Sequence, residues 1–227
     1  MMNPDGSEQR QLTKNAGDIN SRPNVSPDNR FVVFTSTRSG AKQIWRMDID
    51  GGNPRQLTEV EPMAEGPNLS PDGAWVYYSL NEGETASIWK IPSNSGEPVA
   101  VSRNIHAWSP SVSPDGKFIA YQLYDKSAVK PWKTGVMSAE TGEPLRTFDT
   151  FCLRHITSWT ADSKSLIYID GDTGNLRRLP IDGRGSRQIT NFESGQIYNF
   201  AISPDFKQIV VSRGNPSMEV VLITNFR

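Results

Sequence analysis

The sequence predicts an all-β fold made of repeated antiparallel units, because one short phrase returns along the chain at a nearly constant distance. The phrase reads Pro-Asn-Val-Ser-Pro-Asp-Asn in its first copy, and its Ser or Thr recurs every 43 to 47 residues across the 227-residue chain. A period of this length is typical of proteins whose supersecondary units stack around a shared core. The repeat positions are Ser26, Ser70, Ser113, Thr160 and Ser203.

The first repeat shows which elements a unit contains. The turn at Ser26 is followed by Phe31-Val-Val-Phe-Thr-Ser, a β-branched and aromatic run of strand length. Residues 44–49 alternate apolar with mostly polar side chains, as a half-buried strand does. Residues 50–53 form a hairpin turn and residues 55–58 a short outer strand. With the stretch before Ser26, these are four antiparallel strands, A to D, which is the composition of one propeller blade.

The other repeats match piece by piece, so the sequence predicts a five-bladed β-propeller in a single domain spanning residues 1–227. The predicted blades are 14–58, 59–102, 103–150, 151–190, and 191–227 plus 1–13. Residues 9–13 read as a D strand with no A, B or C strand before it, whereas the last repeat has no D strand. We therefore expect residues 9–13 to pair with residues 218–224 and close five four-stranded blades without an open edge.

The composition excludes several classes of partner. Twenty-four basic and 25 acidic residues are well mixed and give a net charge of −1, so we expect no nucleic-acid binding. No apolar run approaches the ~20 residues that span a bilayer, and the N-terminus lacks the pattern of a signal peptide. Cys152 is the one cysteine, which excludes a disulfide within the chain. We expect a monomer.

A family resemblance rests on the repeated motifs. The series Ser-Pro-Asp-Gly, apolar run, Arg-Ser-Gly, Ile-Trp-x-Met, Asp-Gly-Gly, Leu-Thr resembles the TolB-type, or WD-like, β-propeller repeat. The resemblance covers about 215 residues and is weaker in the fourth repeat, where Thr160-Ala-Asp-Ser replaces the usual turn. Propellers of this type usually have six or more blades, so the chain is either a five-blade version or a segment of a longer propeller.

The tail, residues 211–227, is similar to the end of propellers attached to bacterial serine/threonine kinases. The resemblance implies a non-catalytic binding or scaffold propeller, the recognition (sensor) module of a larger bacterial signalling protein. It leaves the location open, and implies an extracytoplasmic (periplasmic) one if the propeller is the sensor end of a membrane receptor.

The binding residues are expected on the loops that lead into the A strands, where a propeller binds a protein or a small molecule at the mouth of its channel. Five of the candidates lie four or five residues before a repeat Ser or Thr, and a histidine shares one of these loops. The candidate set is Arg22, Glu65, His106, Trp108, His155 and Tyr198. The alternative is an ordinary solvated rim.

The sequence predicts no metal, cofactor or catalytic site. His106, His155 and Glu65 match no compact metal motif. Residues 48–53 lack the later ligands of a calcium loop and are explained as a turn. The chain has no Gly-x-Ser-x-Gly motif. A propeller glycosidase needs two carboxylates that face each other, whereas the loops that lead into the A strands carry one candidate carboxylate, Glu65. The alternative function is a propeller glycoside hydrolase or lyase with a sparse active site.

Three further features are the recurring aspartates, the repeated tryptophans and the long loop of the third repeat. The aspartates at 28, 72, 115, 162 and 205 recur with the A–B turn, so we expect them to be structural. Trp45 and Trp89 occupy the same strand position in successive repeats and are expected in the core. The B–C loop of the third repeat, residues 124–133, carries Val129, Pro131 and Trp132 between lysines. Trp132 could contact a partner, but we expect it to fold back onto its own blade.

Overall fold

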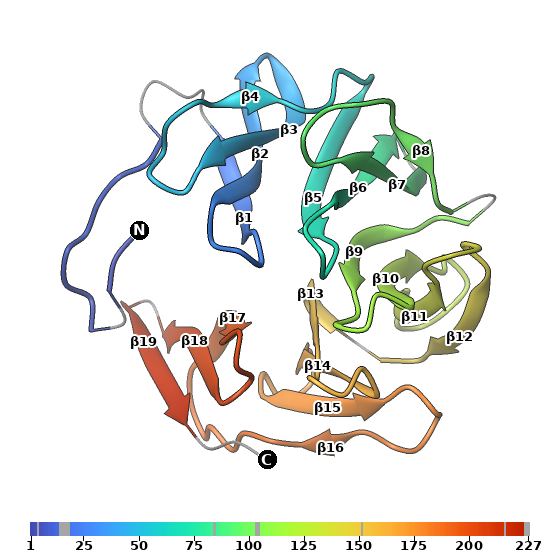
Figure 1. The fold of residues 1–227 in the computed structure, drawn as a ribbon. Coiled ribbons are helices and arrows are strands. Elements are labelled where there is room, and N and C mark those ends of the chain that lie inside the picture. Colours follow the sequence, from blue (N-terminus) through green and yellow to red (C-terminus); the bar gives the residue numbers. More distant parts are fainter. Residues whose placement is uncertain are drawn as a thin grey trace. The chain divides into compact units, whose positions relative to one another are not determined.

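The computed structural model describes residues 1–3, 5–13, 19–83, 85–102, 105–150, 152–215 and 217–224, without the side chains of 152–156, 215 and 217–224. Within these ranges the regular elements are all strands, and they form five antiparallel sheets (Figure 1). None of the described segments is a helix that could cross a membrane. The chain divides into two compact units, residues 1–105 and 106–227, and each is described by itself.

Unit 1 contains two four-stranded sheets, which we call blades 1 and 2. In each blade the strands follow one another in chain order, and every neighbouring pair is antiparallel. Blade 1 consists of β1 (Asn20–Val25), β2 (Phe31–Ser39), β3 (Ala41–Asp48) and β4 (Arg55–Gln56). Blade 2 consists of β5 (Met63–Leu69), β6 (Trp75–Glu82), β7 (Thr85–Pro92) and β8 (Val99–Ala100).

Unit 2 contains three sheets, blades 3 to 5, with the same strand order. Blade 3 consists of β9 (Trp108–Val112), β10 (Phe118–Tyr124), β11 (Trp132–Ser138) and β12 (Pro144–Phe148). Blade 4 consists of β13 (Cys152–Trp159), β14 (Ser165–Asp170), β15 (Leu176–Pro180) and β16 (Arg187–Gln188). Blade 5 consists of β17 (Gln196–Ile202), β18 (Gln208–Asn215) and β19 (Ser217–Thr224).

The repeated A–B turn owes its shape to a local hydrogen bond. In blade 1 the Ser26 hydroxyl donates to Asp28 Oδ1 over 2.6 Å and accepts from the backbone N–H of Phe31 over 3.0 Å. The equivalent Ser or Thr donates to the equivalent Asp in the other four blades. The structural role predicted for the recurring aspartates is therefore confirmed. In blade 5 the fourth turn residue is Phe206, whose φ of +57° places a bulky side chain in the left-handed region.

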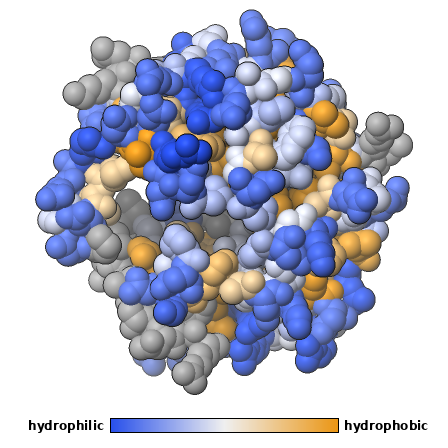
Figure 2. Space-filling view, viewed as in Figure 1, coloured by the Kyte–Doolittle hydropathy of each residue, from blue (hydrophilic) through white to orange (hydrophobic). Residues whose placement is uncertain are grey.

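Three buried clusters of the described residues lie between consecutive blades of one unit. Blades 1 and 2 share a buried cluster that includes Val33, Ile44 and Tyr78, and Trp89 packs against it. In unit 2, one cluster joins blades 3 and 4 and another joins blades 4 and 5. Trp45 packs against a cluster on the other face of blade 1. Both repeat tryptophans are partly buried at the edge of these clusters, not inside the core as predicted. The face viewed in Figure 2 is mostly hydrophilic, and its apolar side chains occur in small separate groups.

The prediction of five four-stranded blades is wrong, because four blades are four-stranded and blade 5 has three strands among the described residues. Residues 9–13 form no strand. Instead, Leu12 packs against the Val32, Phe34 and Met47 cluster of blade 1. A Cβ built on Gly51 would lie 3.0 Å from the Leu12 carbonyl oxygen. The apolar side chain of this segment is thus packed within unit 1.

That residues 1–227 form a single domain stays a prediction.

Candidate functional site

The first strand of every blade contains a break in register close to the predicted site residues. In β1 the break falls between Ser21 and Asn24, and in β5 between Glu65 and Asn68. The other three blades show the same irregularity. Positive φ values accompany it at Arg22 (+52°), Gly66 (+69°) and Ser109 (+52°). A β-bulge redirects the side chains beside it, so the bulges give each blade a set of side chains outside the regular ladder.

In unit 1 the structure brings Arg22 and Glu65 into one charged group. Glu65 accepts a hydrogen bond from Lys42 Nζ over 2.9 Å and another from Asn81 Nδ2 over 2.8 Å. Burial by itself would raise the pKa of the Glu65 carboxyl. The hydrogen bond and charge of Lys42, with smaller contributions from Asn81 and Arg22, outweigh burial and lower that pKa.

The surroundings of Glu65 in the charged group favour its ionised carboxylate. A general acid needs a carboxyl pKa raised toward neutrality, whereas the pKa of Glu65 is shifted the other way. Both carboxylate oxygens already accept hydrogen bonds from Lys42 and Asn81. Glu65 can therefore orient Lys42 and Asn81 or contact a cationic group, but its proton is not held ready for transfer.

In unit 2 the structure builds an aromatic group from four residues of blade 3 and the loop before it. His106 stacks on Trp108 with ring centroids 6.3 Å apart. Trp108 meets the edge of Trp132 at 5.5 Å, and Trp132 meets Tyr124 at 5.0 Å. Trp108 and Trp132 are partly exposed, and His106 and Tyr124 are exposed. Edge-to-face contacts of this kind stabilise aromatic pairs beyond the area that they bury.

Ion pairs and turn hydrogen bonds hold the loop beside the aromatic group. Lys133 Nζ lies 2.9 Å from Asp125 Oδ2, and Lys130 Nζ lies 2.5 Å from Asp172 Oδ2 in blade 4. The Ser127 hydroxyl and then Lys133 lower the pKa of Asp125 to about 2. Between these anchors Val129 is fully exposed. The loop thus presents an exposed apolar side chain between two ion pairs.

Four of the predicted site residues fall into two groups. Arg22 and Glu65 belong to the charged group, and His106 and Trp108 belong to the aromatic group. Tyr198 is partly exposed on β17. The side chain of His155 lies outside the described residues.

The sequence reasoning did not foresee the contacts of Lys42, Asn81 and Tyr124. Trp132 folds back onto its blade as expected, but it does so against the predicted site residue Trp108. The signal was the strand order. In an antiparallel sheet the beginning of strand A lies at the same end as the B–C hairpin, which carries Asn81 and Tyr124. Lys42 instead reaches Glu65 from the neighbouring blade 1. Within the described residues, no cluster of three or more His, Cys, Asp or Glu side chains could hold a metal ion.

Comparison with known proteins gives a family and a fold. The family model for the TolB beta propeller domain, PD40, matches residues 1–131. The Tol-Pal system protein TolB of Bordetella pertussis is 46% identical over 48 residues, a stretch that covers 21% of this chain and 11% of that protein. The chain thus matches a small part of the curated relative's length.

Two solved structures show the architecture. The putative TolB from Agrobacterium tumefaciens superposes with a TM-score of 0.76 at 20% identity, covering 91% of this chain and 77% of that one. An oligogalacturonate lyase in complex with manganese superposes with a TM-score of 0.67 at 14% identity, covering 94% of this chain and 65% of the lyase chain. At these identities the two structures establish the fold alone, an all-β propeller with four-stranded antiparallel blades.

Proposed function

Because the chain belongs to the TolB beta propeller domain family, we propose that it is a non-catalytic protein-recognition module whose partner binds at the aromatic group of blade 3. The observation that carries the proposal is the contact series of His106, Trp108, Trp132 and Tyr124 at the surface. Tryptophan and tyrosine are enriched among the residues that dominate binding energy at protein interfaces. A partner would cover rings that are already held in place.

The contacts around the rings support the same site. Each ring contacts a neighbouring ring, and the adjoining loop carries the ion pairs Lys133–Asp125 and Lys130–Asp172. Binding to an ordered surface loses less conformational entropy than binding to a loose one. The exposed Val129 lies between the loop lysines, so an apolar contact has a charged border, as at the rim of an interface.

The finer role follows the family resemblance. We propose that the propeller is the recognition part of a larger bacterial signalling protein. The name of the Bordetella relative assigns that protein to the Tol-Pal system, and for this chain we propose a protein partner of its own. Arg22, Glu65, His155 and Tyr198 stay in the proposal as residues at the A-strand ends of the other blades.

Site-specific cross-linking tests the proposal. A photoreactive benzoylphenylalanine at position 129 should capture a partner, and the same residue at the exposed Val99 of blade 2 serves as the control. The captured protein is then purified, and its affinity is measured by calorimetry. Trp108→Ala and Trp132→Ala should each weaken binding about tenfold or more. Trp75→Ala truncates a partly exposed tryptophan of blade 2 and should leave the affinity unchanged. Equal affinity for all three variants would contradict the proposal.

The lyase structure favours a second candidate function, a propeller lyase acting on acidic oligosaccharides. This second function is supported by the shared fold. Among the described residues, the lowered pKa of Glu65 argues against it, because an ionised carboxylate cannot donate a proton. Incubation with oligogalacturonides and Mn²⁺, followed by chromatography of the products, separates the two functions. Turnover that Glu65→Gln or His106→Ala abolishes would replace the recognition proposal.

A further inference from the structure

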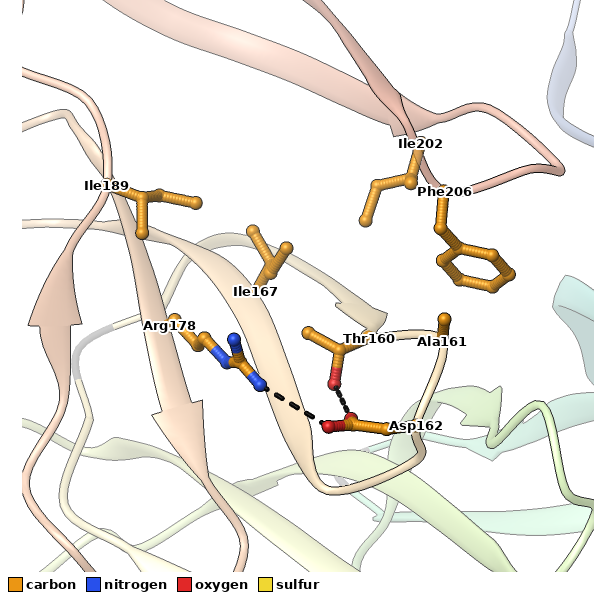
Figure 3. Close-up of a pocket in the computed structure, with 8 residues that line it drawn as sticks. All are labelled: Thr160, Ala161, Asp162, Ile167, Arg178, Ile189, Ile202 and Phe206. Carbon is orange, nitrogen blue, oxygen red and sulfur yellow. Dashed lines mark hydrogen bonds and ion pairs between the residues drawn. The ribbon is translucent and has the colours of Figure 1, made fainter. Parts of the chain in front are cut away.

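A hollow opens between blades 4 and 5 of unit 2, away from the aromatic group. Its volume is about 230 Å³, and Ile167, Ile189, Ile202 and Phe206 form its apolar lining. In Figure 3, Ile202 and Phe206 lie across the hollow from Ile167, and each side comes from a different blade. This apolar hollow is part of the cleft between two blades.

A second, basic groove of about 370 Å³ adjoins the hollow. Both are lined by Asp162 and Arg178, whose side chains form a 3.6 Å ion pair at the boundary between them. The groove adds Lys164, Arg184 and Arg187. Apolar and basic surface therefore meet at one point of blade 4.

The charges of the groove are unbalanced, although the whole chain is nearly neutral. Lys164, Arg178, Arg184 and Arg187 supply four positive charges. Asp162 lies opposite Arg178, and Asp182 pairs with Arg184 over 2.7 Å within one turn. The side chain of Arg184 is 80% exposed, and Arg187 and Lys164 are exposed as well. Guanidinium groups presented in this way match carboxylates in a bidentate geometry.

The volume of the apolar hollow limits the size of the apolar group that can enter it. Pockets for drug-sized molecules usually measure about 300–1,000 Å³, and the apolar hollow, at about 230 Å³, is smaller. It is suited to a single apolar side chain. We propose that blade 4 binds a short acidic peptide segment of a partner protein. One leucine-sized side chain of the segment enters the hollow, and its carboxylates contact Arg184, Arg187 and Lys164.

The test uses a fluorescein-labelled peptide, Asp-Glu-Asp-Leu-Asp-Glu-Asp, and fluorescence anisotropy with the whole chain. Arg184→Glu reverses one charge of the groove, and Ala161→Phe fills the edge of the hollow from an exposed turn position. Arg30→Glu is the matched control, because Arg30 is 81% exposed and pairs with Asp28 two residues away, as Arg184 does with Asp182. Circular dichroism and thermal melting verify that each variant is folded.

Arg184→Glu and Ala161→Phe should each weaken binding about tenfold, and Arg30→Glu should change it less than about twofold. A peptide with Ser in place of Leu should also bind about tenfold more weakly. The proposal is overturned if the wild-type chain does not bind the peptide or if the Ser peptide binds equally well. It is also overturned if millimolar inorganic phosphate displaces the peptide completely, since the groove would then be a general anion site. Binding to phosphatidylglycerol vesicles that Arg184→Glu abolishes would reassign the groove to a lipid surface.

Discussion

The beginnings of the A strands in blades 2 and 3 have the same backbone arrangement but carry different kinds of side chain. Both combine a bulged first strand, a residue with positive φ (Gly66 or Ser109) and an adjoining B–C hairpin. In blade 2 this end carries Glu65, which accepts hydrogen bonds from Asn81 of the same blade and from Lys42 of blade 1, whereas in blade 3 it carries stacked aromatic rings. The repeat therefore fixes the backbone at this end of a blade, whereas the side chains that it carries differ between blades.

The two ends should also respond differently to conditions. The Glu65–Lys42 contact is partly exposed, with side-chain exposures of 24% and 33%, so salt screens it in part. The contacts of Trp108 with Trp132 are apolar and change little with ionic strength. Substitutions at each end can therefore separate the contribution of the shared backbone from that of the side chains.

The largest expected effect comes from the backbone of blade 3. A Cβ on Gly135 in β11 would clash with Cζ of the buried Tyr121. We expect Gly135→Ala to lower the free energy of unfolding by about 3 kcal/mol through overpacking, measured by urea denaturation. Gly185→Ala, whose Cβ meets nothing within 4 Å, is the control. Equal losses in both variants would mean that blade 3 is loosely packed.

A smaller effect is expected in the aromatic group itself. Trp132→Ala should cost about 2 kcal/mol, less than the truncation of a fully buried tryptophan, because Trp132 is partly exposed. A double-mutant cycle with Trp108→Ala should give a coupling energy of about 1 kcal/mol. A cycle of Trp132→Ala with Trp75→Ala of blade 2 should give none. If the first cycle also gives none, the ring contact does not contribute to stability.

The next effect concerns the bulge of blade 2. Gly66 has a φ of +69°, and a Cβ placed there would meet nothing nearer than Arg22 Nη1 at 3.6 Å. Gly66→Ala therefore tests backbone strain without a steric clash, and we expect a loss of about 1 kcal/mol in chemical denaturation. A loss as large as that of Gly135→Ala would show that the bulge, and not packing, limits the stability of the blades.

The smallest effect is expected at the charged group, and it depends on pH. The pKa of Glu65 is lowered in the folded chain, so its ionised form stabilises the fold above the ordinary Glu pKa of about 4.3. This contribution is lost as the pH falls through the lowered pKa. Glu65→Gln should cost less than about 1 kcal/mol at pH 7 and should flatten the decline in stability below pH ~4.3. Thermal melts across this pH range measure it, with the exposed Glu97→Gln as the control. Identical pH profiles for Glu65→Gln and the wild type would exclude the charged contact.

Much of the site could be named from the sequence, but its grouping could not. Trp108 and Glu65 are recognisable because they occupy the same offset before the repeat Ser or Thr. Tyr124 lies on a strand whose end meets strand A only after the sheet has formed, and Lys42 meets Glu65 only after blade 1 has packed against blade 2. Sequence distance hid the contact between Trp108 and Trp132, although the antiparallel order of the strands implies it.

The repeat unit can be recognised from the sequence. Each A–B turn is held by a Ser or Thr bonded to an Asp two residues later, and contacts this local need no distant partner to be read. The position of residues 9–13, in contrast, depends on tertiary packing. They have the composition of an outer strand, yet the structure packs Leu12 onto blade 1 and leaves blade 5 with three strands among the described residues. The physical reason is that a short edge strand gains little from its own sequence. Its place depends on which apolar surface is available to bury it.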